Sequence, residues 1–148
     1  MKQYHIITFG RTKDKGLLAV QEEYTRRLQR YTPVKRTIWK HASKAQASTK
    51  VLNYSAAHTK EALLVLDEQG KEMNTTELQK FVEAIHNTQE IVTFVVGDAH
   101  GFEDVVQKQT TCLSLSKLTL PHELALTLLM EQLYRIETLK HNHPYHKV

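Results

Sequence analysis

The residues best suited to chemistry lie in the C-terminal third of this 148-residue chain. Arg135 stands near the end of a strongly apolar segment, where a cation needs an anionic or polar partner. The simpler interpretation is a solvent-exposed charge that complements the dipole at a helix end. Tyr145 and His146 follow in a polar tail, 140–147. The position of this tail indicates that it borders a site rather than a core.

The same tail permits a second interpretation, because His141, His143 and His146 are closely spaced. A metal ion needs ligands in a fixed geometry, and no cysteine or carboxylate cluster lies beside these histidines. We therefore expect no metal and keep a histidine-tailed metal-binding module as an alternative. Cys112 is the only cysteine, which excludes an internal disulfide and suits a reducing compartment.

The glycines argue against the common nucleotide-binding loops. Neither a G-x-G-x-x-G fingerprint nor a G-x-x-x-x-G-K-[ST] phosphate loop occurs. Gly97 and Gly101 flank a turn after the apolar stretch 91–96. Ligands of open α/β sheets bind beyond the carboxyl ends of the strands, so this turn is a candidate binding loop. Ordinary turn geometry explains the same glycines equally well.

The segments that must position these residues alternate along the chain between predicted strands and predicted helices. Apolar runs predict strands at 3–9, 34–40, 62–67, 91–97 and 113–116. Apolar spacing predicts a helix over 14–31, and Asn74 with Glu77 forms a capping box that opens a helix to about residue 86. The polar region 45–58 is read as a loop or weak helix. This order predicts one α/β domain, 1–148, with a mostly parallel sheet flanked by helices.

The last predicted helix, 121–140, begins at a proline suited to a first turn. Apolar residues occur on nearly every side of it, so it needs cover on two sides. In so small a chain, a second copy of the protein is the expected cover, and we predict a homodimer through this helix. The apolar residues are Leu124, Ala125, Leu126, Leu128, Leu129, Met130, Leu133 and Ile136.

Charge is unevenly distributed around the net value of +4. Region 26–50 holds eight basic residues and no acidic one, and 51–148 is net acidic. A one-signed segment beside an acidic body is typical of a face that binds a polyanion; a solvated basic surface is the alternative. No run is long enough to cross a bilayer, and the opening residues are too short for a signal peptide, so we expect a cytoplasmic protein without a membrane span. The nucleic-acid-binding candidates are Arg26, Arg27, Arg30, Lys35 and Arg36.

Several motifs in order resemble one family. They are Phe9-Gly10-Arg11, Leu64-Val65-Leu66-Asp67, Thr93-Phe94-Val95-Val96-Gly97, the run from Leu113 to Leu124, Glu131-Gln132-Leu133-Tyr134-Arg135 and Asn142-His143-Pro144-Tyr145-His146-Lys147. Along the whole chain they are similar to the RlmH family of SPOUT-class enzymes, which methylate N3 of a pseudouridine in large-subunit (23S) ribosomal RNA. The resemblance implies S-adenosylmethionine as methyl donor, a C-terminal trefoil knot, and a homodimer in which the tail reaches the pocket of the partner.

The resemblance also implies roles for particular residues. Arg135, Tyr145, His146 and His122 would handle the substrate, although the sequence does not select a proton acceptor. Arg135 would favour the deprotonated imide, and either His146 or His122 would pass the proton on. From the sequence alone, core packing is the better explanation for the leucines of the pocket. The cofactor contacts carried over by position are Leu66, Gly97, Ser116, Lys117, Leu118, Thr119 and Leu120.

Two positions depart from the family pattern. Asp98 stands where the family usually has a second glycine, and it brings a negative charge close to the cofactor loop. Leu126 stands where an arginine is usual, which removes a cation that would touch RNA or the dimer partner. A catalytically silent RNA-binding relative, with a pocket spoiled by Asp98, is therefore the main alternative to an active methyltransferase.

Overall fold

Five parallel strands form the centre of the fold in the computed structural model, which describes residues 2–147. The strands are β1 (Gln3–Phe9), β2 (Val34–Trp39), β3 (Glu61–Glu72), β4 (Ile91–Val96) and β5 (Thr111–Ser114). Their order across the sheet is β2-β1-β4-β3-β5, and every neighbouring pair is parallel. The predicted α/β fold is confirmed. Four of the predicted strands begin within one residue of the observed ones, but β3 continues to Glu72, and β5 begins and ends two residues before the predicted 113–116.

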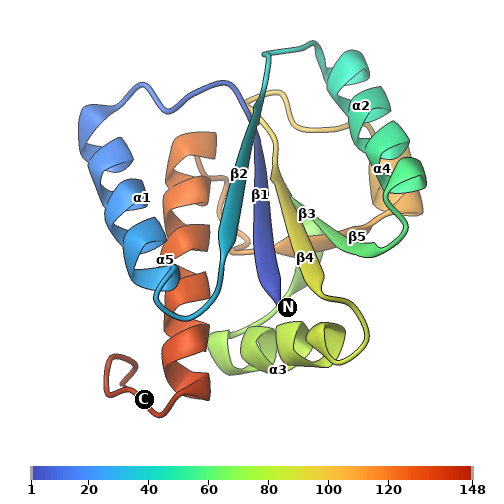
Figure 1. The fold of residues 1–148 in the computed structure, drawn as a ribbon. Helices are drawn as coiled ribbons and strands as arrows, with labels where there is room; N and C mark the ends of the chain where they lie inside the picture. Colours follow the sequence, from blue (N-terminus) through green and yellow to red (C-terminus); the bar gives the residue numbers. More distant parts are fainter. Residues whose placement is uncertain (1, 148) are drawn as a thin grey trace.

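Helices cover both faces of this sheet (Figure 1). The helices α1 (Lys15–Leu28), α3 (Thr75–His86) and α5 (His122–Lys140) pack on one face, where Leu28, Leu78 and Leu129 meet the strands. The helices α2 (Lys44–Ala57) and α4 (Asp104–Gln109) cover the other face through Val51 and Val106. Within residues 2–147, no helix is long and apolar enough to span a membrane.

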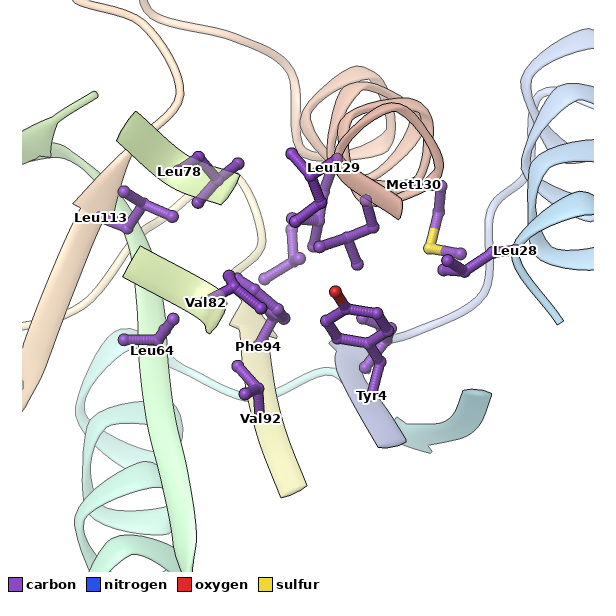
Figure 2. Close-up of a cluster of buried hydrophobic side chains, with 14 of the residues drawn as sticks. Tyr4, Leu28, Leu64, Leu78, Val82, Val92, Phe94, Leu113, Leu129 and Met130 are labelled. Carbon is purple, nitrogen blue, oxygen red and sulfur yellow. The ribbon is translucent and has the colours of Figure 1, made fainter. Parts of the chain in front are cut away.

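The larger core lies between the sheet and α5 (Figure 2). Phe94 and Val92 of β4 meet Leu129 and Met130 of α5, and all four side chains are fully buried. The hydroxyl of Tyr4, which lies under α5, donates a hydrogen bond to the buried Glu137 carboxylate, Oη to Oε2 3.2 Å. This contact and the surrounding apolar packing fix α5 on the central strands.

The prediction for α5 needs two corrections. Pro121 is the N-cap with an extended ψ of 142°, so the helix begins at His122 rather than at the proline. The sheet, α1 and α3 also bury most of the apolar surface within one protomer. Leu129 is completely buried, whereas Leu128 on the outer side is 37% exposed. The surface left for a partner is therefore a narrow stripe, not a whole helix face.

Two helices differ from the sequence-based expectations. Region 45–58, read as a loop or weak helix, forms the 14-residue helix α2. Its N-terminus is a capping box: the Ser43 hydroxyl accepts from the Gln46 N–H, and the Gln46 side chain accepts from the Ser43 N–H. This S-x-x-Q signal outweighs the weak apolar pattern that follows it. The short helix α4 was not predicted.

Candidate active site

A cavity of about 400 Å³ opens beside the middle of β3 and the carboxyl ends of β4 and β5. Three segments meet there: residues 66–69 at an irregularity within β3, residues 97–102 after β4, and residues 115–120 after β5. The family resemblance implies cofactor contacts in each of these three segments. Six of the seven predicted cofactor residues line the cavity, and only Lys117 does not. Those six are Leu66, Gly97, Ser116, Leu118, Thr119 and Leu120.

The β4 loop is shaped by a close approach at Gly97. A Cβ added to Gly97 would lie 2.7 Å from the Phe102 ring, which is buried and packs on Phe9. Asp98 then closes a compact turn, because its carboxylate accepts from the His100 N–H at 3.0 Å and its carbonyl accepts from the Gly101 N–H at 3.1 Å. Asp98 lines the cavity, and its side chain is 9% exposed. The departure from the family pattern therefore adds a carboxylate that the loop itself holds in place.

The β3 loop depends on an irregularity in the β3–β5 pairing. Leu113 is in register with both Leu66 and Lys71, so the residues between them bulge toward the cavity. A Cβ on Gly70 would lie 2.6 Å from the Cys112 carbonyl carbon, so only glycine allows the two strands to approach this closely. The bulge places Glu68 where its carboxylate accepts a 2.7 Å hydrogen bond from the Thr119 hydroxyl of the β5 loop.

The cavity suits a cationic ligand with an apolar end. Leucine side chains supply the apolar lining. The Ser116 hydroxyl accepts a hydrogen bond from the Leu118 N–H at 3.0 Å and so fixes the turn of the β5 loop. Leu118 itself is 71% exposed at the edge. The charged residues of the lining are four carboxylates and one lysine: Asp67, Glu68, Asp98, Asp104 and Lys44. This excess of negative charge fits the sulfonium and ammonium groups of S-adenosylmethionine.

The predicted substrate-handling residues separate into two places. His122 lines the cavity at the start of α5, where its neighbour Glu123 accepts from the backbone N–H groups of Lys13 and Asp14. These two N–H groups lower the pKa of Glu123. Arg135 lies thirteen residues further along α5, about 20 Å away at a rise of about 1.5 Å per residue. The tail is at this far end of α5 (Figure 1).

Arg135, Tyr145 and His146 come together around Glu131, a residue to which the sequence analysis gave no role. Arg135 donates through Nε and Nη2 to the Glu131 carboxylate, the shortest distance being 2.7 Å. Its Nη1 lies 3.2 Å from His146 Nδ1, and its guanidinium stacks 4.8 Å above the Tyr145 ring. The i, i+4 spacing of Glu131 and Arg135 on a predicted helix was the one sequence feature that could have predicted this ion pair.

Tyr145 is held by two oxygens. Its hydroxyl donates to Glu131 at 2.8 Å and therefore accepts from the Tyr24 hydroxyl at 3.0 Å. Burial and these hydrogen bonds raise the pKa of Tyr145, and the hydrogen bonds to Glu131 raise the pKa of Arg135. Tyr145 is thus a neutral phenol and Arg135 a permanent cation at working pH, and neither is suited to accept a proton.

The predicted RNA-binding residues differ in availability. The guanidinium carbon of Arg27 lies 5.1 and 5.7 Å from the ring centres of Tyr24 and Tyr134. These contacts join the end of α1 to the Glu131 cluster, which consists of Glu131, Arg135, Tyr145 and His146. Arg26 pairs with Glu23, yet its side chain is 64% exposed. Arg36 on β2 is half-buried: burial lowers its pKa, and its buried Nε finds no hydrogen-bond partner within residues 2–147. Arg30 and Lys35 are exposed.

The three tail histidines have separate partners. His141 Nδ1 faces the Glu137 carbonyl at 2.8 Å, His143 Nδ1 accepts from the Tyr145 N–H, and His146 contacts Arg135. Across residues 2–147, no group of three histidine, cysteine or carboxylate side chains has a geometry that could hold a metal ion. The arrangement gives the metal-binding alternative no support.

A pocket of this size at the carboxyl edge of a parallel sheet is the usual small-molecule site of an open α/β protein. The family described as "Predicted SPOUT methyltransferase" matches residues 1–146. Ribosomal RNA large subunit methyltransferase H of Thermus thermophilus is 42% identical over 85% of both chains. The protein of that name from Maridesulfovibrio salexigens is 36% identical over the full length of both.

The chain therefore belongs to the SPOUT methyltransferase family, and the resemblance seen in its motifs is confirmed. The solved structure of the SpoU methyltransferase AviRb from Streptomyces viridochromogenes matches with a TM-score of 0.49 at 13% identity. That match covers 94% of this chain and 61% of the other.

Proposed function

We propose that this protein is a cytoplasmic methyltransferase that uses S-adenosylmethionine to methylate N3 of a pseudouridine in large-subunit (23S) ribosomal RNA. The observation that carries the proposal is the cavity between the middle of β3 and the ends of β4 and β5, which is lined by six of the residues that the family motifs assign to the cofactor. The names of the relatives support the RNA substrate. The C-terminal trefoil knot implied by the family is part of the same proposal.

The residues of the cavity would hold the two ends of the cofactor differently. Leu66 and Leu120, which line the cavity, would pack against the flat adenine, and backbone groups of the β4 and β5 loops would bind its polar edge. The carboxylates of Asp98 and Asp67 lie in the lining and attract the cationic end. When bound, the cofactor supplies an activated methyl group on a positively charged sulfur.

The distance between His122 and Arg135 along α5 indicates that one protomer does not form a complete site alone. His122 borders the cavity, whereas Arg135, Tyr145 and His146 lie about 20 Å away at the far end of the helix. We propose that a homodimer brings this cluster of one protomer to the cavity of its partner. The exposed Leu128 on the outer side of α5 lies between the two groups and supports an interface there.

The protein groups then have defined tasks at the target base. Arg135 is a cation whose Nε and Nη2 groups donate to Glu131. Its positive charge stabilises the imide of the base after the imide loses its N3 proton. His122 or His146 passes the proton on. Holding the nitrogen in line with the methyl group supplies much of the acceleration, of the order of 7–11 kcal/mol in well-aligned intramolecular reactions.

The exposed cations near the end of α1 position the RNA without selecting a base. Arg26 and Arg30 are the clearest test, because Arg27 is stacked on aromatic rings that reach the tail cluster. The double variant Arg26→Glu and Arg30→Glu should weaken binding to every RNA and reduce the slope of log K against log salt by about 2 or more. Cofactor affinity, measured alongside, should be unchanged.

Calorimetric titration with S-adenosylmethionine and its demethylated product tests the cofactor. Methyl transfer to ribosomes that carry pseudouridine, compared with ribosomes that carry uridine at that position, tests the substrate. No heat with either compound would favour the silent RNA-binding relative. Equal methylation of the two ribosomes would contradict the proposed base specificity.

A further inference from the structure

The hydrogen bonds of Arg135 determine more than its own position. A guanidinium carries five N–H donors and has no acceptor. His146 Nδ1, which lies 3.2 Å from Arg135 Nη1, must therefore accept this hydrogen bond with its lone pair. In a neutral imidazole the proton must then be on the other ring nitrogen, Nε2.

Arg135 in turn is held by Glu131. Three N–H to carboxylate contacts between 2.7 and 3.2 Å fix the plane of the guanidinium, and both side chains are mostly buried, at 25% and 17% exposed. Tyr145 completes the arrangement by donating to the same carboxylate and by lying under the guanidinium. Each hydrogen bond has only one possible direction, from Tyr24 to Tyr145 to Glu131 and from Arg135 to both Glu131 and His146.

We infer that Glu131 is a positioning residue which, through Arg135, holds His146 with Nε2 protonated, so that His146 presents an N–H donor to the target base rather than acting as its proton acceptor. This inference rests on the proposed function for the identity of the base. An Nε2–H donor suits a carbonyl oxygen of the imide, where negative charge collects once N3 has lost its proton. Of the two histidines proposed as proton acceptors, only His122 then remains.

The inference is tested without any activity by nitrogen-15 NMR of the dimeric protein labelled at histidine. The expected result is a neutral His146 ring with its proton on Nε2. A proton on Nδ1 overturns the inference. If the ring has the expected tautomer but the protein methylates neither ribosome, the proposed function fails and the assignment of the tautomer remains.

Two substitutions of His146 separate a donor from an acceptor in the methyl-transfer assay. A glutamine amide nitrogen takes the place of Nε2, whereas an asparagine amide takes the place of Nδ1. His146→Ala and His146→Asn should lower kcat by about 100-fold, the usual loss for one donor at a developing oxyanion. His146→Gln should recover kcat to within about tenfold of the parent. Equal losses in His146→Gln and His146→Ala would contradict the donor role, and Lys147→Gln in the same tail is the control.

The role of Glu131 is tested by a double-mutant cycle. Glu131→Gln keeps the size of the side chain but weakens its hold on Arg135, so kcat should fall while KM for the cofactor and the melting temperature stay near the parent values. If part of the effect of Glu131 passes through His146, the same change should cost less in the His146→Ala background, where only its effect through Arg135 remains. Additive losses would show that Glu131 does not act through His146 and would overturn its positioning role.

Discussion

The hydroxyl of Tyr24 on α1 donates a hydrogen bond to the hydroxyl of Tyr145 in the C-terminal tail, at 3.0 Å. Two residues 121 positions apart thus connect the tail to α1, the helix that carries the exposed Arg26. The contact gives the tail a fixed conformation, although its residues form no helix or strand.

Removing this hydrogen bond should loosen the tail without disturbing the core. We expect Tyr24→Phe to lose about 1 kcal/mol from the docked tail, because the ring packing on Tyr134 remains. Methyl transfer should fall severalfold, and amide exchange should become faster over residues 143–147. Tyr31→Phe, which keeps the ring that lies 4.6 Å from the His141 ring, is the matched control. Unchanged exchange in Tyr24→Phe would contradict this anchoring role.

Arg135 should contribute to the transition state and little to binding. Arg135→Ala is expected to lower kcat by about 100-fold or more while RNA and cofactor affinity stay nearly intact. Arg135→Lys keeps the charge but loses the two-point contact with Glu131, so it should remain well below the parent. Single-turnover rates with saturating cofactor measure the effect. A lysine variant with full activity would show that charge alone is sufficient.

The carboxylate of Asp98 should favour a cationic ligand over a neutral one. S-adenosylmethionine carries a positive sulfur that its demethylated product lacks, so Asp98→Asn should weaken the former several-fold more than the latter. Calorimetry with both ligands at low salt measures the difference. Glu90→Gln, which is outside the cavity lining, controls for the change in net charge. If Asp98→Gly instead strengthens cofactor binding, the side chain obstructs the pocket.

Neighbouring leucines on α5 should respond in opposite ways to the same charge. Leu128→Glu, at a position that is 37% exposed, should leave the fold intact and shift the protein toward monomers in light scattering. Leu129→Glu should unfold the protomer, because this fully buried side chain lies in the core beside Phe94; even Leu129→Ala should cost about 2–5 kcal/mol. A dimer unaffected by Leu128→Glu would place the interface elsewhere.

Stability should fall as the pH drops below neutrality. Burial lowers the pKa of His5 and of His86, so the folded protein binds fewer protons than the unfolded chain near pH 6.5. Their contribution is complete above that value and is lost as the pH falls through the lowered pKa values. His5→Asn should flatten the curve of melting temperature against pH between 8 and 5, and an unchanged curve would exclude His5.

A second decline should follow at lower pH. Burial raises the pKa of Glu61, but hydrogen bonds from Thr93, Tyr54 and His5 outweigh it, and the net pKa is lowered. Stability from Glu61 is therefore present above its ordinary pKa and is lost as the pH falls through the lowered value. Glu61→Gln should remove this second decline.

The sequence predicted the sheet well, because β4 and the first half of β3 are continuous apolar runs, and the carboxyl ends of parallel strands meet at one edge of a sheet. It predicted α3 from Asn74 and Glu77, whose capping box is present in the structure. It failed for α2, where the capping signal at Ser43 precedes a helix with little apolar periodicity. The motifs supplied the cavity residues, which periodicity alone would have assigned to the core.

The cluster around Glu131 illustrates a different limit. Arg135, Tyr145 and His146 were selected as chemical groups, yet their mutual contacts depend on a tail that turns back on α5. A positive φ of 57° at Asn142 starts that reversal, and nothing in the residue spacing predicts that Tyr145 meets Tyr24. Contacts between distant segments of this kind become visible only once the helices are packed.

The pairing of β1 with β4 has a consequence for the synthesis of the protein. Gln3, made among the first residues, faces Ile91 across the sheet, so the central pair of strands cannot form until nearly two-thirds of the chain has left the ribosome. Until then β1 has only β2 as a neighbour and presents an open edge that invites pairing with other chains. Folding should therefore be late and slow for a chain of this length, and nascent chains that stop before β4 should aggregate or require a chaperone.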